Sequence, residues 1–349
     1  MASQKLFQAI PPFPDDLPTA SMRTISLQSL KSGDEAAAAS LMAACQELGF
    51  FLLDLDGDSL GNELINNIDQ MFLAGKEIMN LPSGVKAHYL NDAPKSFLGR
   101  ERFKPRGSAK TETDKPDRFE WFNIGQDGLV GNTALQPLPP LVHTHLPLIT
   151  SFLKHGQDVV AAISSVIATQ IGLPSDTFTS LQDPIKPSGT VVRLIKAFAS
   201  PDLEDLRTSM IHHTDFGTIT LLANVLGGLQ ILAPGRSPTE ESAWLWVRPR
   251  PQCLIVNLGD AMVQWTGGLL RSNVHRIRHG PGTQRFVDRY SLALLVRPQR
   301  NASMRKLVSH EGDVEDSQLT AWEWEVMKTM ALTRGESVTE SKGGKQPAV

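Results

Sequence analysis

Apolar residues recur at helical spacing along the first half of the chain. Because positions three or four apart share one face of a helix, this spacing predicts three helices, over residues 35–48, 61–79 and 146–171. Ser32 and Glu35 stand before the first of these as a capping-box pair, in which each side chain can satisfy a free amide of the first turn. The first half is therefore expected to form a helical layer.

The pattern changes from residue 189 onward, where short apolar runs alternate with turn residues. The runs are TVVRLIKAF, GTITLLANV, GLQIL, WLWVRP, QCLIVNLG, AMVQW and RYSLALLVRP. Strands this short and this closely spaced predict an antiparallel sandwich or jelly roll. An earlier apolar run at residues 50–53 predicts one further buried strand, and the spacing over residues 319–332 predicts a final helix.

These patterns divide the chain into four parts. Residues 1–185 are expected to form a helical N-terminal layer packed on the core, with a long surface loop over 91–140. Residues 186–300 form the predicted jelly-roll core, and residues 301–335 carry the C-terminal helix. Residues 336–349 are polar and rich in glycine, serine and lysine, which predicts a flexible tail. The fold class that follows is mainly β with flanking helices.

Composition and charge exclude several classes of protein. The 349 residues include 34 Lys and Arg against 37 Asp and Glu, for a formal charge of −3, and 41% are hydrophobic. A disordered chain, or one whose main partner is nucleic acid, does not fit this balance. Cys45 and Cys253 are too few for a zinc finger or a disulfide framework. With no pattern typical of a signal peptide or a membrane span, we expect a cytoplasmic protein, monomeric or weakly dimeric, without membrane contact.

The strongest candidate chemistry lies in the run HHTDFGTITLL. On an extended backbone His213 and Asp215 point to the same side, so an imidazole and a carboxylate face one spot. His275 lies in a second strand-like run and can complete a set of three. Two His and one carboxylate leave open positions on one face of a metal, which suits non-haem Fe(II). Each of these residues alone is more often structural, so the hypothesis needs a further element.

That element is the pair Arg289 and Ser291, which share one face of the run RYSLALLVRP. Arginine offers a forked, permanently charged set of donors that suits a carboxylate, and serine adds a hydroxyl to the same oxygen. A dicarboxylate could chelate the metal with its keto-acid end and anchor its far end on this pair.

Together these motifs resemble the Fe(II)/2-oxoglutarate-dependent dioxygenase superfamily, in the branch that contains isopenicillin N synthase and the plant flavonoid and gibberellin oxidases. HTDFGTITLL followed by GGLQI is similar to the family's first ligand strand. IVNLGDAMVQWTGGLLRSNVHRI is similar to the hairpin that carries the distal His, DRYSLALLVRP to the oxoglutarate strand, and ACQELGFFLL to the helix and strand before the core. The resemblance covers roughly residues 20–335, and its loop-rich first half resembles fungal members that tailor secondary metabolites.

The resemblance implies a distorted double-stranded β-helix, a jelly roll of the cupin kind. His213, Asp215 and His275 would bind Fe(II), and Arg289 and Ser291 would bind the distal carboxylate of 2-oxoglutarate. With O₂ as the second co-substrate, the implied activity is oxidation of a small organic molecule by hydrogen abstraction, giving hydroxylation, desaturation or ring rearrangement in secondary-metabolite biosynthesis. The iron centre does the chemistry, so no separate acid or base is assigned.

One strand departs from the family pattern. Plant relatives often carry Asn-Tyr-Tyr before the first His, where a Tyr helps to hold 2-oxoglutarate. The corresponding stretch here is RLIKAF, and the only tyrosines of the chain are Tyr89 and Tyr290. Arg193 and Lys196 are basic candidates on this strand, but their separation of three places them on opposite faces, so one at most should point inward.

The substrate hypothesis follows from the basic, tyrosine-poor strand and nearby aromatic residues. An acidic or polyoxygenated aromatic substrate is favoured, with candidate contacts at Arg193, Lys196, Phe198, Trp265 and Phe122. Two other functions stay open at this point. One is an iron oxidase of the same fold that does not use 2-oxoglutarate, and the other is a non-catalytic binding module.

Overall fold

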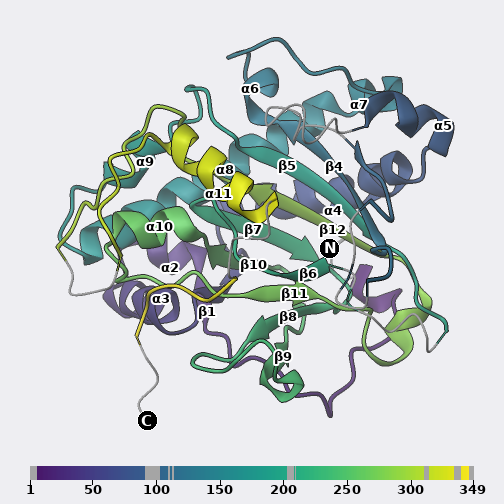
Figure 1. Cartoon of the computed structure of the whole chain (residues 1–349), viewed down its shortest axis with the longest axis horizontal. Helices are drawn as coiled ribbons and strands as arrows, with labels where there is room; N and C mark the ends of the chain where they lie inside the picture. The colour runs from purple at the N-terminus through teal and green to yellow at the C-terminus, as the bar shows by residue number, and fades with distance from the viewer. Residues whose placement is uncertain are drawn as a thin grey trace.

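Two β-sheets with helices packed against the larger one form the protein (Figure 1). The computed structural model describes residues 6–90, 103–108, 111, 114–202, 208, 210–309, 314–333 and 339–345. Its strands are β1 (Thr24–Ser26), β2 (Phe50–Asp54), β3 (Phe103–Lys104), β4 (Phe119–Gly125), β5 (Val191–Ala197), β6 (Met210–His213), β7 (Ile219–Asn224), β8 (Leu229–Leu232), β9 (Trp244–Trp246), β10 (Cys253–Leu258), β11 (His275–Ile277) and β12 (Arg289–Leu295). Its helices include α2 (Leu27–Lys31), α3 (Glu35–Glu47), α4 (Ser59–Met79), α5 (Ser83–Lys86), α6 (Gln126–Leu129), α7 (Pro140–Thr144), α8 (Leu146–Gln170), α9 (Thr177–Leu181), α10 (Asp260–Trp265) and α11 (Ala321–Thr333).

In the described part of the chain, the strands form the two sheets of a jelly roll, and these sheets are not hydrogen-bonded to each other. The larger sheet runs β1-β2-β10-β7-β12-β5-β4-β3, and the smaller one runs β6-β11-β8-β9. Apart from the parallel pair β1 and β2, neighbouring strands in both sheets are antiparallel. The described strands form two facing sheets rather than a closed barrel. This arrangement confirms the predicted mainly β fold with flanking helices.

The two faces of the larger sheet pack against different partners. Its outer face packs on α4 and α8, and α8 comes so close that a Cβ added to Gly156 would lie 2.5 Å from Leu294 Cδ2. Its inner face turns toward the smaller sheet. At one end, six apolar residues from both sheets and the loop after β9 form a dry cluster, namely Phe50, Leu52, Leu229, Ile231, Val247 and Ile255. The other end carries the polar side chains of the site.

The long predicted helices are confirmed, with one difference at a cap. The three expected helices correspond to α3, α4 and α8, and the expected C-terminal helix corresponds to α11. The N-cap of α3 is Asp34, whose side chain accepts from the amide of Ala37 at 2.9 Å, whereas Ser32 ends α2. Gly33, with φ of +78°, turns the chain between these two helices, which leaves Ser32 too far back to cap the second one.

Two segments differ from their predictions. AMVQW forms the end of the helix α10 instead of a strand, and because all of α10 is buried, its sequence offered no alternation to separate the two. The expected loop 91–140 contains β4, a seven-residue strand inside the larger sheet. Within 91–140, residues 91–102, 109–110 and 112–113 lie outside the described residues.

The C-terminal end also differs from the expected flexible tail. Residues 339–345 lie against the core, where Lys342 and Ser272 exchange two backbone hydrogen bonds of 2.8 and 2.9 Å. Residues 336–338 and 346–349 lie outside the described part of the chain. Among the described helices, none combines the length and the apolar character that a membrane span requires.

Candidate metal centre

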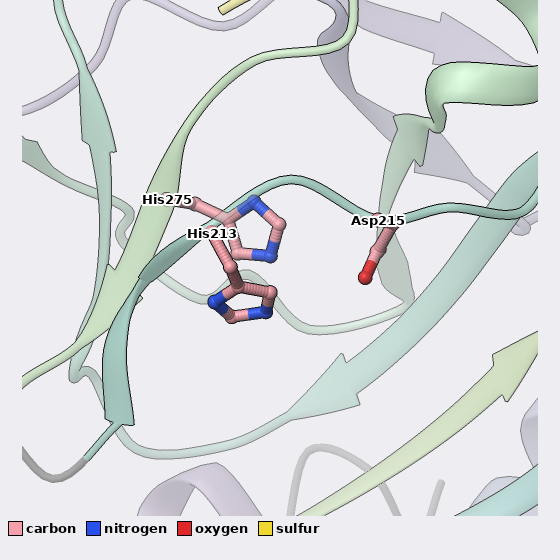
Figure 2. Close-up of side chains that lie close together, drawn as sticks. All are labelled: His213, Asp215 and His275. Atoms are coloured by element: carbon pink, nitrogen blue, oxygen red, sulfur yellow. The ribbon is translucent and has the colours of Figure 1, made fainter. Parts of the chain in front are cut away.

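Two neighbouring strands of the smaller sheet bring together three side chains that could hold a metal ion. His213 ends β6 and His275 begins β11, and these two residues are direct partners in the antiparallel ladder. Their ring centroids lie 4.3 Å apart. Asp215 follows β6 by two residues and turns its carboxylate to the same point, as Figure 2 shows. One ligand atom from each residue lies within 4.8 Å of the others, which is a spacing that one metal ion can bridge.

Hydrogen bonds to backbone carbonyls fix the tautomer of the two imidazoles. Nδ1 of His213 lies 3.0 Å from the carbonyl oxygen of Ile211, and Nδ1 of His275 lies 3.2 Å from that of Asn273. Since a carbonyl can only accept, each Nδ1 carries the proton and donates it. Each Nε2 therefore keeps its lone pair, which is the form a metal ligand needs.

Two donors hold the Asp215 carboxylate by a single oxygen. Oδ2 accepts from Thr220 Oγ1 at 2.7 Å and from Asn257 Nδ2 at 2.8 Å. The backbone carbonyl of Asp215 accepts from the amide of Asp260 at 2.8 Å, which anchors the loop as well. With Oδ2 occupied by the protein, Oδ1 is the oxygen left to bind a metal.

The charge states of the three residues suit a divalent cation. Burial alone would raise the pKa of Asp215, but the two imidazoles and the hydrogen bonds from Asn257 and Thr220 outweigh it and lower that pKa to about 2. Burial and the neighbouring His275 lower the pKa of His213 to about 4, against the attraction of Asp215. At neutral pH the site therefore presents a carboxylate and an imidazole with a free lone pair.

A buried cation lies on the inner face of the larger sheet. Arg289 and Ser291 alternate inward on β12 and are 3% and 4% exposed. Arg289 Nε donates to the carbonyl oxygen of Leu226 at 3.3 Å, and burial lowers the pKa of its guanidinium to about 10. Its side chain is packed against the backbone of Gly228, where an added Cβ would lie 3.2 Å from Arg289 Cδ.

Two polar atoms of Arg289 and Ser291 lack a hydrogen-bond partner among the described residues. Arg289 Nη2 and Ser291 Oγ are buried without a hydrogen-bond partner, and Arg289 has no ion pair among the described residues. A buried guanidinium without an anion is strongly unfavourable, so this arrangement fits a site completed by the carboxylate of a ligand. The residues present therefore fit both groups that the resemblance implies, a divalent metal and a dicarboxylate.

The residue of β5 that pairs with Arg289 is small and apolar. Ala197 pairs with Arg289 on one side and with Phe119 on the other, so the residue facing the buried guanidinium across β5 is an alanine. On the opposite side, Asn224 of β7 pairs with Ser291. No side chain of β5 supplies a hydroxyl next to Arg289, in agreement with the absence of tyrosine from this stretch of the sequence.

A cavity of about 410 Å³ opens beside the metal-binding residues. His213 and Asp215 line it together with Arg193, whose guanidinium lies 4.3 Å from the ring centre of Trp121. Arg193 Nε donates to Asn123 Oδ1 at 2.7 Å, which holds the guanidinium at the cavity wall. Of the two basic residues of β5, Arg193 is thus the one that turns inward.

The structure does not bring the other four expected substrate contacts to this cavity. Lys196 lies on the opposite face of β5, where it binds Asn80 and pairs with Asp288, and with Phe198 it lines a separate cavity of about 500 Å³. Phe122 also points outward and stacks on Phe103 in the main core. Trp265, on the helix α10, is fully buried in the main core, where it stacks on Phe178.

Sequence reasoning missed several cavity and support residues. Phe119 and Trp121 line the cavity from β4, a strand that lies within a charged, proline-rich stretch of sequence. Thr220 and Asn257 support Asp215 from β7 and β10, strands that pair side by side only in the folded sheet. The aromatic run FEWFNIG was the signal that could have revealed β4, because aromatic residues favour strands.

Known proteins share both the sequence pattern and the fold. Residues 190–298 match the 2OG-Fe(II) oxygenase superfamily, and residues 20–139 match the N-terminal region of the non-haem dioxygenases in morphine synthesis. The 2-oxoglutarate-dependent dioxygenase ecdG of Aspergillus rugulosus is 30% identical, over 81% of this chain and 83% of its own length. The 2-oxoglutarate-dependent dioxygenase AFUA_1G01000 of Aspergillus fumigatus is 27% identical, over 85% of this chain and 80% of its own.

Two solved structures have the same fold. A full-length Neurospora crassa protein, crystallised in complex with alpha-KG, superposes with a TM-score of 0.74 at 19% identity, covering 91% of this chain and 100% of that one. A 2OG-Fe(II) oxygenase family protein from Caulobacter crescentus gives the same TM-score at 23% identity, with 90% and 100% covered.

The chain belongs to the 2OG-Fe(II) oxygenase superfamily. It is an Fe(II)- and 2-oxoglutarate-dependent dioxygenase that uses O₂ and oxidises a small organic molecule. The predicted fold, enzyme class and cofactors are thereby confirmed.

Proposed function

We propose that His213, Asp215 and His275 bind the Fe(II), and that Arg289 and Ser291 bind the distal carboxylate of 2-oxoglutarate. Two observations carry this assignment: the three convergent ligands, and the buried guanidinium and hydroxyl without partners on the inner face of the larger sheet. Bound Fe(II), oxoglutarate and O₂ supply the oxidising power that removes a hydrogen atom from the substrate. The chain's own residues hold, orient and shield these groups.

The substrate class follows from the cavity wall. Arg193 places a positive charge close enough to His213 to help lower the pKa of that imidazole, so an anionic group bound there would lie near the metal. Trp121 and Phe119 add flat apolar surface beside the guanidinium. An acidic or polyoxygenated aromatic molecule of secondary metabolism combines both features, and the fungal relatives support that setting.

The assembly and location follow from simpler features. All the proposed ligands come from one chain, which supports a monomer or a weak homodimer. Cys45 and Cys253 are free thiols, which fits a reducing compartment and supports a cytoplasmic location. Analytical ultracentrifugation at micromolar protein tests the first of these points.

Turnover experiments test the assignment of the ligands. His213→Ala and Asp215→Ala should each abolish release of succinate from oxoglutarate, because either change leaves an incomplete ligand set. His155→Ala is the matched control, since its ring contacts Asn67 between α8 and α4 and does not line the cavity, and it should retain activity. Substrate oxidation that needs no oxoglutarate would instead favour an iron oxidase of the same fold, and a wild-type chain that binds no iron would favour a binding module.

Arg193→Met tests the proposed substrate class. The variant keeps a flexible unbranched side chain but removes the charged guanidinium, so the KM for an acidic aromatic substrate should rise while the oxoglutarate requirement stays constant. The readout is succinate released in response to a panel of aromatic acids and their methyl esters. An equal response to acids and esters in the wild type would contradict an anionic substrate.

A further inference from the structure

The last described segment, residues 339–345, is built to dock on the core. Ser272 and Lys342 exchange backbone hydrogen bonds, and the amide of Gly344 donates to the carbonyl of Gly268 at 2.8 Å. Ser341 Oγ accepts from the amide of Val274 at 3.1 Å, so the segment binds the strand residues that lead directly into His275. Figure 1 shows this part of the chain, in yellow, running beside β11.

The sequence of the segment fits this position closely. Gly343 and Gly344 have φ of +64° and +77°, a region that residues with a side chain rarely occupy. An added Cβ would also collide with the backbone carbonyl of Leu270 at the first position and of Gln46 at the second. Only glycine fits at these two consecutive positions, which indicates a specific docked conformation rather than a loose tail.

A shared carboxylate ties the segment to the metal-binding loop. Lys342 Nζ lies 2.6 Å from Asp260 Oδ2, the same oxygen that pairs with Lys328 of α11. Asp260 is almost fully buried, and its amide donates to the carbonyl of Asp215. Through Asp260, the docked segment is therefore linked to the backbone of Asp215, one of the proposed iron ligands.

The docked segment reaches the cavity through Thr339. This residue lines the same 410 Å³ cavity as Arg193, His213 and Asp215. We propose that Thr339, held in place by the docked residues 341–345, forms part of one wall of the substrate cavity, and that its side chain limits the size of the molecule admitted to the metal. This inference rests on the proposed function, because it concerns access to the same iron site.

Access of a chelator to the metal tests this wall without a substrate. The wild-type chain is loaded anaerobically with Fe(II), and removal of the metal by 2,2′-bipyridine is followed by the colour of the product. Removing residues 339–349 should speed this removal severalfold, because the wall is absent. Thr339→Trp should slow it severalfold, because the side chain fills the cavity. Effects of opposite sign are not expected from a segment that only stabilises the fold.

Glycine variants separate docking from general strain. Gly344→Ala should undock the segment, raise the hydrogen exchange of residues 339–345 and speed iron removal as truncation does. Gly172→Ala is the matched control, because Gly172 has φ of +78° with open space around it, and its rate should equal the wild-type rate. If truncation and Thr339→Trp both leave the rate unchanged, the wall is overturned. If wild-type protein binds no Fe(II), the proposed function fails instead.

Discussion

The carboxylate of Asp215 is held by two donors, and removing one of them is a direct test of how the site is supported. Thr220→Val keeps the shape of the side chain but deletes the hydroxyl that lies 2.7 Å from Oδ2. Asn257→Ala deletes the second donor, at 2.8 Å from the same oxygen. In either variant, the carboxylate can turn, and its second oxygen competes for the metal.

The size of the effect follows from the chemistry of the bond. A buried hydrogen bond to a charged group contributes about 1.5–3 kcal/mol. Loss of a partner that orients a metal ligand weakens metal binding by about 10–100-fold. Because both donors hold one oxygen, the double variant should lose less than the sum of the two single losses. Asp215 stays ionised at neutral pH in each variant, so the loss reflects orientation rather than charge.

Anaerobic titration with Fe(II) measures these losses as dissociation constants. Thr190→Val is the matched control, because it removes a buried threonine hydroxyl that accepts from the amide of Arg297, away from the proposed ligands. That variant should bind Fe(II) with wild-type affinity. Wild-type affinity in both Thr220→Val and Asn257→Ala would refute the reasoning that these donors position Asp215.

Three other predictions concern the proposed carboxylate-binding pair Arg289 and Ser291, the pH dependence of stability, and the packing of Phe122. Arg289→Ala should raise the oxoglutarate concentration needed for half-maximal succinate release far more than Ser291→Ala does, because it removes a charge rather than a hydroxyl; equal effects would contradict the assignment. His213 has its pKa lowered from 6.5 to about 4, so the unfolded chain binds the extra proton and metal-free stability should fall as the pH is lowered between those values. Urea unfolding at several pH values checks this, and His213→Ala should flatten the dependence. Phe122→Ala should destabilise the fold by about 3–5 kcal/mol without changing the KM of either substrate, since Phe122 is buried in the outer core; a rise in substrate KM would return it to the cavity.

The sequence predicted the proposed ligands better than their surroundings. His213, Asp215 and His275 stand out because metal ligands demand specific side chains, and the cross-strand pairing of β6 with β11 then brings them together. The support from Thr220 and Asn257 could not be foreseen, because it depends on which strands become neighbours. Common polar residues at those positions carry no signal of their own.

The remaining misses have local physical causes. Alternation along β5 correctly separated Arg193 from Lys196, but alternation alone does not say which face is inside. The segment that contains Trp265 is apolar throughout, so its sequence fits a strand and a helix equally. A polar composition that includes Gly343 and Gly344 predicts a flexible tail, although the same glycines allow close contact with the backbone of the core.

The most direct measurement is the absorption spectrum of the protein mixed anaerobically with Fe(II) and oxoglutarate. Chelation of the metal by the keto acid produces a metal-to-ligand charge-transfer band in the visible region. The account predicts this band in the wild type, its loss in His213→Ala and Asp215→Ala, and its appearance only at much higher oxoglutarate in Arg289→Ala. A wild-type band that persists unchanged in all three variants would contradict the assignment of the site.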